Sequence, residues 1–421
     1  MPASHTVVPL GPDRRADVVR LDQTAFMIPD EGLDHEVAYF EWDRTAGVVV
    51  ERDERLVGVY TVFSLGLSTP DGPDGAGTRR TPMAGLSWVG VDPAHRRRGV
   101  LSAMIRHHLH GLHEQGLEAV SGLFASEAAI YGRFGYGSAV SGLTLELPRG
   151  AALRPLRAEE GNGTVSVDFV TADVERHADL VAGLYDEACV RRPGMVWRPA
   201  ALNRRDIDDP PRRRQRGEPL RLLVAESAGR ATGYALLRRE LTWTDGSPSG
   251  VARVDELVAC DAATSRALWS SVTDLDLVTR TRTPALAADD PLLTLLVDTR
   301  ATQAQRRDGL WLRLVDVDRA LEQRTYARDI DVVLAVTDEL CPWNARRWRL
   351  SAGPQGATCS PTTDDADLAL DVRELGAAYV GGVSLAALAA AGLVTELKGG
   401  AVARLSAALR GAVEPAPSFA F

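Results

Sequence analysis

The sequence predicts an α+β fold that is divided among several domains. Its 421 residues exceed what one hydrophobic core ordinarily holds, because domains average about 100–200 residues. In the first third of the chain, a β-rich hairpin, a strand, a glycine turn, an amphipathic helix and a further strand follow one another. A similar order recurs after residue 220, and the last third combines apolar strands with helices rich in Ala and Leu. These three observations together predict a series of α+β domains.

The first 150 residues contain the elements of one α+β unit. Two β-rich runs around a charged turn predict a hairpin over 48–63, and a loop rich in Gly, Pro and Asp follows at 69–78. After Gly99, apolar side chains recur at helical spacing, which predicts an amphipathic helix. The other expected elements are strands at 84–91, 117–124 and 141–147, a short helical piece at 126–131 and a turn at 135–137.

The order of elements recurs at lower fidelity in residues 151–300, which indicates an internal duplication. A second hairpin is expected over 221–238, a strand over 253–260 and a helix over 264–272. The turn between this strand and this helix lacks both the glycine and the arginine cluster of the first unit. We therefore expect one cofactor site rather than two.

Residues 301–421 differ again in character. Apolar segments predict strands at 310–317, 330–336 and 345–350, and dense Ala and Leu predict helices at 384–392 and 401–409. Pro415 and Pro417 cannot easily continue a helix, so the last seven residues are expected to be extended.

The composition indicates a soluble globular protein. Hydrophobic residues make up 45% of the chain and charged residues 25%, and no apolar run approaches about 20 residues. The first ten residues do not resemble a signal peptide, and four scattered cysteines argue against a disulfide framework and structural zinc. We therefore expect a cytoplasmic protein with no membrane partner. The formal charge of -9 disfavours a nucleic-acid partner and favours a cationic substrate.

The most informative segment runs from Ser87 to Leu101, where a strand leads into a tight basic turn that opens a helix. The first N–H groups of a helix lack partners within it, and the helix dipole adds positive charge, so this place suits a pyrophosphate. Arg96, Arg97 and Arg98 add charge, and Gly99 allows a close approach of the backbone. The alternative is an ordinary β–α connection with solvated arginines. This segment on its own leaves both interpretations open.

Further motifs resolve that choice through a resemblance. The turn Val89-Gly-Val-Asp-Pro-Ala-His-Arg-Arg-Arg-Gly99 is accompanied by characteristic segments at 125–137, 341–348 and 375–382 and by a C-terminal phenylalanine. In these segments the chain resembles the Eis (enhanced intracellular survival) family of aminoglycoside N-acetyltransferases, and the matches follow one another over nearly the whole chain.

The resemblance implies a domain order and an assembly. It implies a GNAT N-acetyltransferase domain at 1–150, a second and degenerate GNAT domain at 151–300, and a sterol-carrier-protein-like domain at 301–421 whose end enters the active site. It also implies a homohexamer.

The resemblance implies acetyl-CoA as cosubstrate and a set of residues that bind it. Val89 and Val91 would bond the pantetheine amides through their backbone, and the backbone of Trp88 would lie beside the acetyl group. The residues expected at the pyrophosphate turn are Arg96, Arg97 and Gly99, with Val100 at the start of the helix. Ser126 completes the expected cofactor-binding set.

Two residues are expected to be catalytic. Acyl transfer from a thioester releases a thiolate, and the resemblance implies that the phenol of Tyr131 donates a proton to it. The alternative is a tyrosine that only packs in the core. Ala128 and Ala129 stand where the family commonly has glycine. The resemblance further implies that the α-carboxylate of Phe421 enters the active site and deprotonates the amine, whereas the default for a chain end is a frayed tail.

Other polar residues give weaker signals. Acidic side chains would attract a polycation, or would simply be solvated; they are Asp30, Glu31, Asp34, Glu36 and Glu414. Four histidines occupy adjacent faces of one predicted helix at 107, 108, 110 and 113, but no HExxH motif or acidic partner completes a site, so we expect no metal.

The function that we predict is direct transfer of an acetyl group from acetyl-CoA to the primary amines of a cationic, aminoglycoside-like polyamine, at one or several positions. Two alternatives remain. A protein lysine N-acetyltransferase shares the chemistry but needs an open groove for an extended peptide. A non-catalytic lipid-binding protein would use an apolar cavity in the last domain and the first domain as a scaffold.

Overall fold

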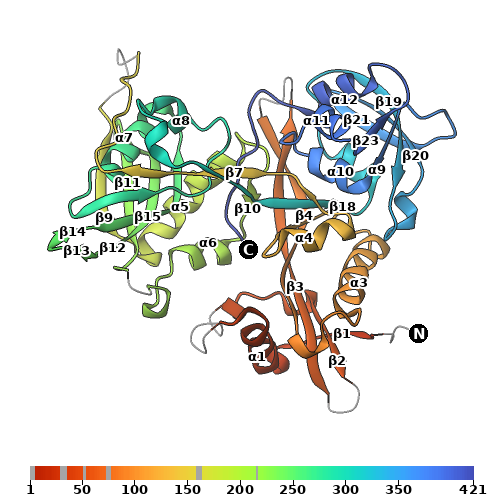
Figure 1. Ribbon diagram of the computed structural model, residues 1–421, viewed down its shortest axis with the longest axis horizontal. Coiled ribbons are helices and arrows are strands. Elements are labelled where there is room, and N and C mark those ends of the chain that lie inside the picture. Colours follow the sequence, from red (N-terminus) through yellow and green to blue (C-terminus); the bar gives the residue numbers. More distant parts are fainter. Residues whose placement is uncertain (1–4, 29–35, 51–53, 73–76, 158–163, 215–216) are drawn as a thin grey trace.

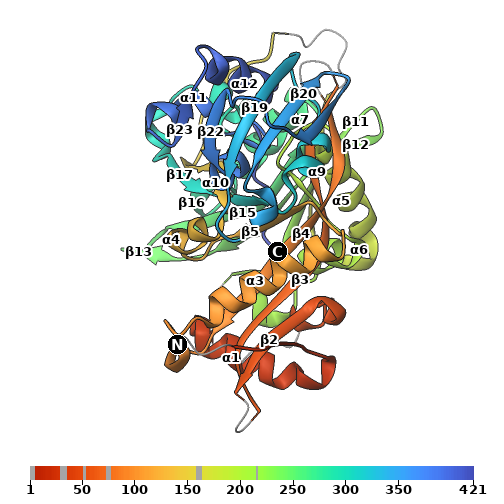
Figure 2. The same cartoon turned by 90° about the vertical axis from the view of Figure 1, so that its right-hand side faces the viewer.

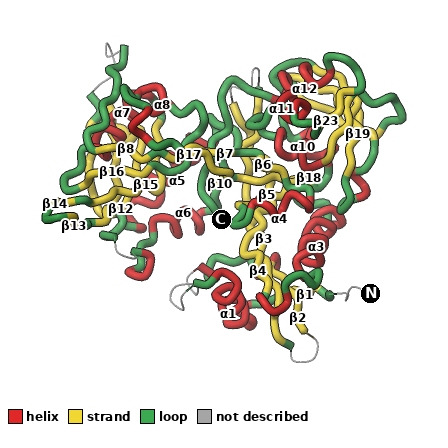
Figure 3. The backbone as a smooth tube through the Cα atoms, viewed as in Figure 1, coloured by secondary structure: helices red, strands yellow, loops and turns green. Residues whose placement is uncertain are grey.

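The computed structural model describes residues 5–28, 36–50, 54–72, 77–157, 164–214 and 217–421. Three lobes follow the order of the chain, and the long strands β3 and β4 run between the second and third lobes (Figure 1). The C-terminus lies at the centre, where the lobes meet, in both views (Figure 2). Each lobe mixes helices and strands (Figure 3), as an α+β fold requires. Among the described residues no helix is long and apolar enough to cross a membrane.

The first lobe is built on a sheet whose strands lie between Val7 and Leu314 in the sequence. Its long hairpin is β3 with β4, and two short strands from later segments join it. The strand order is β1 (Val7–Pro9), β2 (Thr45–Val50), β3 (Arg55–Asp71), β4 (Gly77–Val91), β5 (Val120–Phe124), β18 (Leu310–Leu314) and β6 (Gly137–Ser138), with β10 (Val196–Trp197) paired to β3. The hairpin expected over 48–63 is present, but the expected loop at 69–78 is wrong, because β3 continues to Asp71 and β4 begins at Gly77.

Two helices cover opposite faces of this sheet. Helix α1 (Arg15–Phe26) buries Val18 and Leu21 in one apolar cluster, and helix α3 (Val100–Glu114) packs into another. The buried positions of α3 recur at intervals of three and four residues, which places them on one helical face. They are Val100, Met104, Ile105, His108, Leu109 and Leu112, which are the positions that the sequence pattern selects, Leu101 excepted.

The second lobe contains a six-stranded sheet covered by helices. The strand expected at 141–147 is divided: β7 (Ser141–Thr144) pairs with β17 (Gln305–Asp308), and the next strand crosses into this sheet. The order is β8 (Glu146–Pro148), β16 (Val278–Arg282), β15 (Gly250–Ala259), β12 (Arg230–Glu240), β11 (Arg221–Ser227) and β9 (Ser166–Thr171). Its helices are α5 (Val174–Cys189), α6 (Ala200–Ile207), α7 (Ala262–Thr273) and α8 (Pro291–Leu295), and β13 (Trp243–Thr244) and β14 (Ser247–Pro248) form a small hairpin.

The third lobe contains a five-stranded sheet with four helices. Helix α12 (Ala401–Leu409) has the expected bounds, whereas the strand expected at 310–317 ends at Leu314 and a helix follows. The order is β21 (Gly356–Pro361), β20 (Arg347–Gly353), β19 (Ile330–Thr337), β22 (Leu368–Asp371) and β23 (Val394–Glu396). The other helices are α9 (Val317–Glu322), α10 (Val372–Ala378) and α11 (Leu385–Ala390).

A buried ion pair joins the first lobe to the third. Arg313 on β18 donates two hydrogen bonds from one guanidinium nitrogen to Asp338, at 2.8 and 2.7 Å, and a third to the carbonyl of Phe134 at 3.0 Å. The Asp338 carboxylate also accepts from the side chain of Asn344 at 3.0 Å. Because both charged side chains are almost fully buried, each depends on the other for its compensation.

Asp338→Ala is therefore expected to lower the free energy of unfolding by about 3–5 kcal/mol, since it leaves a buried guanidinium without its anion. Urea unfolding measures the change. Asp276→Ala is the matched control, because Asp276 pairs with Arg149 at 2.7 Å but lies on the surface, and its loss should leave the midpoint almost unchanged. Equal midpoints for the Asp338 variant and the wild type would contradict this account.

The four histidines of α3 each have a partner in the fold. His107 bonds Tyr60 at 2.7 Å, His110 contacts the carbonyl of Leu340 at 3.0 Å, and His113 bonds Asp316 at 2.5 Å. His108 is buried and bonds the hydroxyl of Ser121 at 2.9 Å, which in turn bonds Tyr136 at 2.8 Å. No cluster of metal-ligating side chains occurs in the described ranges.

Stability is expected to fall in weak acid because of His108. Burial lowers the pKa of this imidazole from 6.5 to about 3, so between these values the unfolded chain binds a proton that the folded chain does not. The free energy of unfolding therefore falls as the pH drops through 6.5, with a slope approaching about 1.4 kcal/mol per pH unit from this group. Urea unfolding at pH 7 and pH 5 should show a shallower loss in His108→Gln, and an unchanged loss would contradict the assignment.

Candidate active site

The edge of β4 is interrupted by a bulge at Trp88. Val59 on β3 lies opposite Gly90, but Thr61 lies opposite Ser87, so one strand has an extra residue between these pairs. Trp88 lies in this bulge and has a φ of 53°, which is uncommon for a residue with a side chain. Its ring packs against Phe40, with centroids 4.7 Å apart. Such costly backbone conformations are concentrated at functional sites.

Beyond the bulge, the edge of β4 that faces β5 is open. In the described residues the parallel pairing of β4 with β5 comprises Ala84 with Ser121 and Gly85 with Gly122. The N–H of Asp92 donates to the carbonyl of Val57 on β3 at 2.9 Å. Because neighbouring residues of a strand point their backbone groups to opposite sides, those of Val91 and Val89 point toward the open edge. This edge can bond the amides of an extended ligand.

The turn after β4 leaves the first N–H groups of α3 without partners inside the helix. Asp92 caps a short helical turn by accepting from the N–H of Ala94 at 2.8 Å, and the following arginines are exposed. Arg97 has a φ of 60°, and Gly99, at the start of α3, has a φ of 90°. No described side chain caps α3, and its first internal bond runs from Ala103 to Gly99 at 2.9 Å. The amides without helical partners, the helix dipole and Arg96 to Arg98 are features that suit an anion.

The second lobe lacks this arrangement at the equivalent turn. There, Asp261 precedes α7 and its carboxylate accepts the N–H of Thr264 at 2.7 Å. A carboxylate at the helix start satisfies the amide that a phosphate would need and repels an anion. The turn of the first lobe is therefore better suited to a pyrophosphate.

Tyr131 ends the short helix α4 (Ala128–Tyr131), which follows β5. Its ring lies against that of Tyr136 at 6.1 Å, nearly edge to face. Burial, with a smaller effect from the Glu127 carboxylate, raises the pKa of Tyr131 to about 12. The phenol therefore keeps its proton throughout the neutral range. Ser126 lies on the exposed loop between β5 and α4.

The C-terminal residue reaches the bulge. The hydroxyl of Ser87 donates to a terminal carboxylate oxygen of Phe421 at 2.8 Å. The Phe421 ring contacts Phe124 at the end of β5, with centroids 5.4 Å apart. It also occupies the space beside Gly85, where an added Cβ would lie 2.9 Å from the ring. The tail is thus docked and contains no helix, as the prolines predict, and the backbone oxygen of Phe421 lies beside Ser87, the residue before Trp88.

The expected site residues gather at the carboxyl ends of β4 and β5. Trp88, Val89 and Val91 lie on β4 and the four residues of the turn follow it, while Ser126 and Tyr131 follow β5. Sequence reasoning missed Ser87, in the middle of the strand expected at 84–91, and Phe124, the last residue of the strand expected at 117–124.

The acidic residues proposed to attract a polycation are less available than expected. Glu36 pairs with Arg213 and lies 3.9 Å from Arg205, and Glu414 pairs with Arg410. These neighbours offset their negative charge. Residues 30, 31 and 34 lie outside the described residues.

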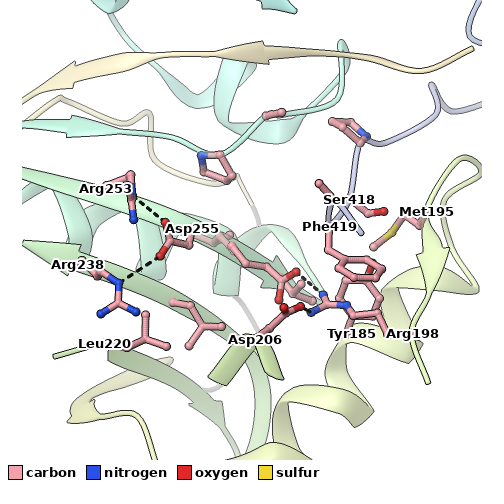
Figure 4. Close-up of a pocket in the computed structure, with 18 of the residues that line it drawn as sticks. Tyr185, Met195, Arg198, Asp206, Leu220, Arg238, Arg253, Asp255, Ser418 and Phe419 are labelled. Carbon is pink, nitrogen blue, oxygen red and sulfur yellow. Dashed lines mark hydrogen bonds and ion pairs between the residues drawn. The ribbon is translucent and has the colours of Figure 1, made fainter. Parts of the chain in front are cut away.

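A cavity of about 490 Å³ adjoins the tail in the second lobe (Figure 4). Strand β15 forms one wall, where its pairing with β16 ends at Arg253, and the tail from Pro417 to Ala420 forms another. Arg253 and Arg238 flank Asp255 at one end, and Arg198 lies at the other.

Three regions of the chain match family models. An acetyltransferase (GNAT) domain matches residues 7–139, a second one matches residues 188–324, and a sterol carrier protein domain matches residues 317–418. The chain therefore contains two GNAT domains and a C-terminal sterol-carrier-like domain, as the sequence predicts.

Full-length relatives extend this result. An uncharacterized N-acetyltransferase of Streptomyces avermitilis is 40% identical over 376 residues, which is 89% of this chain and 88% of the relative. The N-acetyltransferase Eis of Mycobacterium tuberculosis is 34% identical over 390 residues, 90% of each chain. The crystal structure of Eis1 from Mycobacterium abscessus matches with a TM-score of 0.81 at 30% identity and covers 100% of both chains. The protein is therefore an enzyme that belongs to the Eis family of GNAT N-acetyltransferases.

Proposed function

We propose that this enzyme transfers the acetyl group of acetyl-CoA to primary amines of an aminoglycoside-like polyamine. The observation that supports it most is the terminal carboxylate of Phe421, held by Ser87 beside the β4 bulge. A base at this position faces the open strand edge along which a thioester would lie.

The cosubstrate would bind along β4 and its turn. The backbone of Val89 and Val91 would bond the pantetheine amides, and the free amides at Gly99 and Val100 would bind the pyrophosphate together with Arg96 and Arg97. Positioning two reactants supplies about 7–11 kcal/mol of catalysis, so this binding is the largest contribution.

The reaction balances with one proton released. The ammonium of the substrate loses a proton to the Phe421 carboxylate, and the neutral amine attacks the thioester carbonyl. The tetrahedral intermediate then breaks its C–S bond, and its nitrogen loses a second proton to become the neutral amide. The CoA thiolate takes up one proton to leave as thiol, and the other proton passes to the solvent. The direct attack needs no acyl-cysteine. Of the four cysteines, Cys260 is half-buried and the other three are buried.

Tyr131 would assist the leaving thiolate. A thiol has an ordinary pKa of about 8.5, so a phenol with a pKa of about 12 transfers its proton to a thiolate unfavourably at equilibrium. Tyr131 can instead donate a hydrogen bond to the sulfur throughout the neutral pH range, because its phenol stays protonated. As the C–S bond breaks, that bond stabilises the growing negative charge.

The polyamine is proposed from charge as well as from family. The chain has a net charge of -9, which attracts a polycation over a long range.

The Eis resemblance also supports a homohexamer in the cytoplasm and domains at 1–150, 151–300 and 301–421. Sedimentation tests the assembly, and limited proteolysis tests the domain boundaries.

The deciding experiment incubates the full chain with acetyl-CoA and a panel of aminoglycosides, simple polyamines and lysine peptides. Thiol release and product mass are measured. We expect acetylated aminoglycosides, with a mass gain of one or more acetyl groups. Acetylation of the lysine peptides alone would favour a protein acetyltransferase, and thiol release with none of the amines, together with a co-purifying lipid, would favour the lipid-binding alternative.

A further inference from the structure

The tail is held in place near its end by a buried arginine. The guanidinium carbon of Arg198 lies 4.9 Å from the ring centroid of Phe419, and on another side 3.4 Å from that of Tyr185 (Figure 4). The side chain of Arg198 is only 1% exposed, so these cation–π contacts are shielded from water, where they are strongest. Phe419 stands two residues before the terminal carboxylate.

Arg198 itself is fixed from three sides of the second lobe. It pairs with Asp206 on α6 at 2.7 Å and with Glu256 on β15, and Tyr185 belongs to α5. Glu256 also accepts a hydrogen bond from Tyr234 at 2.5 Å. Because these contacts fix the guanidinium of Arg198, its position does not depend on the tail. The tail is therefore positioned relative to Arg198.

The surroundings of Phe419 make this contact important. Phe419 packs against the main apolar cluster on one side, but the tail borders the cavity of about 490 Å³ on another, so close packing does not hold the ring from that side. Neighbouring contacts are weaker: Arg205 donates to the carbonyl of Ala420 at 3.4 Å and lies 5.6 Å from the Phe419 ring. Upstream, the N–H of Val196 donates to the hydroxyl of Ser418 at 3.0 Å.

We propose that Arg198 is a positioning residue, which fixes the terminal carboxylate at the β4 bulge by holding the ring of Phe419. Two residues span at most about 7 Å, so a fixed ring confines the Phe421 carboxylate to the neighbourhood of Ser87. The inference rests on the proposed role of that carboxylate as the base. In this proposal the second GNAT domain holds the tail of the third domain. The start of its own helix α7 is capped by Asp261.

The test compares variants of Phe419, which lies in the tail and whose loss leaves the folded core intact. Phe419→Ala is expected to lower kcat about 10- to 30-fold, because a shielded cation–π contact of about 2 kcal/mol is lost. The KM for acetyl-CoA should not change, since the cosubstrate does not touch this ring. Phe419→Trp keeps the contact and should retain most of the rate. Phe169→Ala is the matched control, because it removes a ring 5.2 Å from Arg239 in the same lobe but far along the chain from the tail.

A double-mutant cycle then assigns the effect to Arg198. Arg198→Lys and Phe419→Ala should not be additive in kcat, and a chain ending at Pro417 should be slow and insensitive to Arg198→Lys. Additive effects, or a further loss from Arg198→Lys in the shortened chain, would overturn the inference. If the shortened chain keeps the full rate, the proposed base itself is wrong. If the shortened chain is slow but Phe419→Ala is not, only the role of Arg198 fails. Thermal unfolding of Arg198→Lys separates loss of rate from loss of fold.

Discussion

A Tyr131→Phe variant is expected to turn over about 100-fold more slowly than the wild type, while it binds CoA with unchanged affinity. A single general acid contributes about 10² to 10⁴ in rate. The lower end applies here, because burial raises the pKa of the phenol to about 12 and weakens it as a proton donor. The loss should appear in kcat, because the hydrogen bond to sulfur becomes strong only as the C–S bond breaks and negative charge grows there.

The neighbouring tyrosine provides the matched control. Tyr136 is fully buried and bonds the hydroxyl of Ser121 at 2.8 Å, so Tyr136→Phe should cost about 1 kcal/mol of stability. Its effect on kcat should be much smaller than that of Tyr131→Phe. Steady-state measurements at saturating substrates compare the two variants, and a wild-type rate for Tyr131→Phe would remove the tyrosine from the mechanism.

Gly99→Glu is expected to weaken CoA binding about 100-fold or more and to abolish turnover at ordinary concentrations. A carboxylate at this position meets the pyrophosphate with like charge, and such a juxtaposition costs several kcal/mol. The backbone adds strain, because the φ of Gly99 is 90°, which a side chain disfavours. The nearest atom to an added Cβ is 3.8 Å away, so the effect is one of charge and backbone rather than of a steric clash.

Two variants separate these causes. Gly99→Ala keeps the strain without the charge and should weaken binding far less. Gly116→Glu places the same charge on another glycine of positive φ, 62°, just after α3 ends, where an added Cβ meets open space. It should leave CoA affinity unchanged. Titration calorimetry with CoA measures all three variants, and equal affinities for Gly99→Glu and the wild type would place the pyrophosphate elsewhere.

Local patterns predicted the helices α3, α4, α7, α11 and α12, whereas α1, α5, α6, α8, α9 and α10 were not predicted. The buried face of α3 follows directly from its apolar spacing, since His108 and five apolar side chains recur at one helical face. The turn between β4 and α3 could be predicted because its parts, a strand end, three arginines and Gly99, are adjacent in the sequence.

Long-range pairing was not predictable in the same way. Residues 69–71 belong to β3 despite their Pro and Asp, since Thr69 lies opposite Arg79 in the hairpin. The hydroxyls of Thr69 and Thr81 bond each other at 2.7 Å, and each lies 3.1 Å from the carbonyl oxygen of Gln323 in the third lobe. Strand β18 pairs with β5 in the first sheet, although the two strands are almost 190 residues apart in the sequence. Tertiary contacts of this kind leave little signal in local composition.

In the candidate site, too, features that depend on adjacent residues could be predicted, whereas features that depend on long-range contacts could not. The residues of the turn and Tyr131 were identified from contiguous motifs. The contact of Ser87 with Phe421 joins positions 334 residues apart, and the backbone bulge at Trp88 depends on the register of β3 against β4. The cation–π contact of Arg198 likewise needs the second lobe to be in place.

The most direct test of the account titrates CoA into the full chain by calorimetry. The account places one pyrophosphate at the turn between β4 and α3, and it leaves the helix start of the second GNAT domain to Asp261. It therefore predicts saturable heat with one CoA per chain, lost on prior addition of acetyl-CoA. Absence of heat, or two equivalent sites per chain, would contradict it.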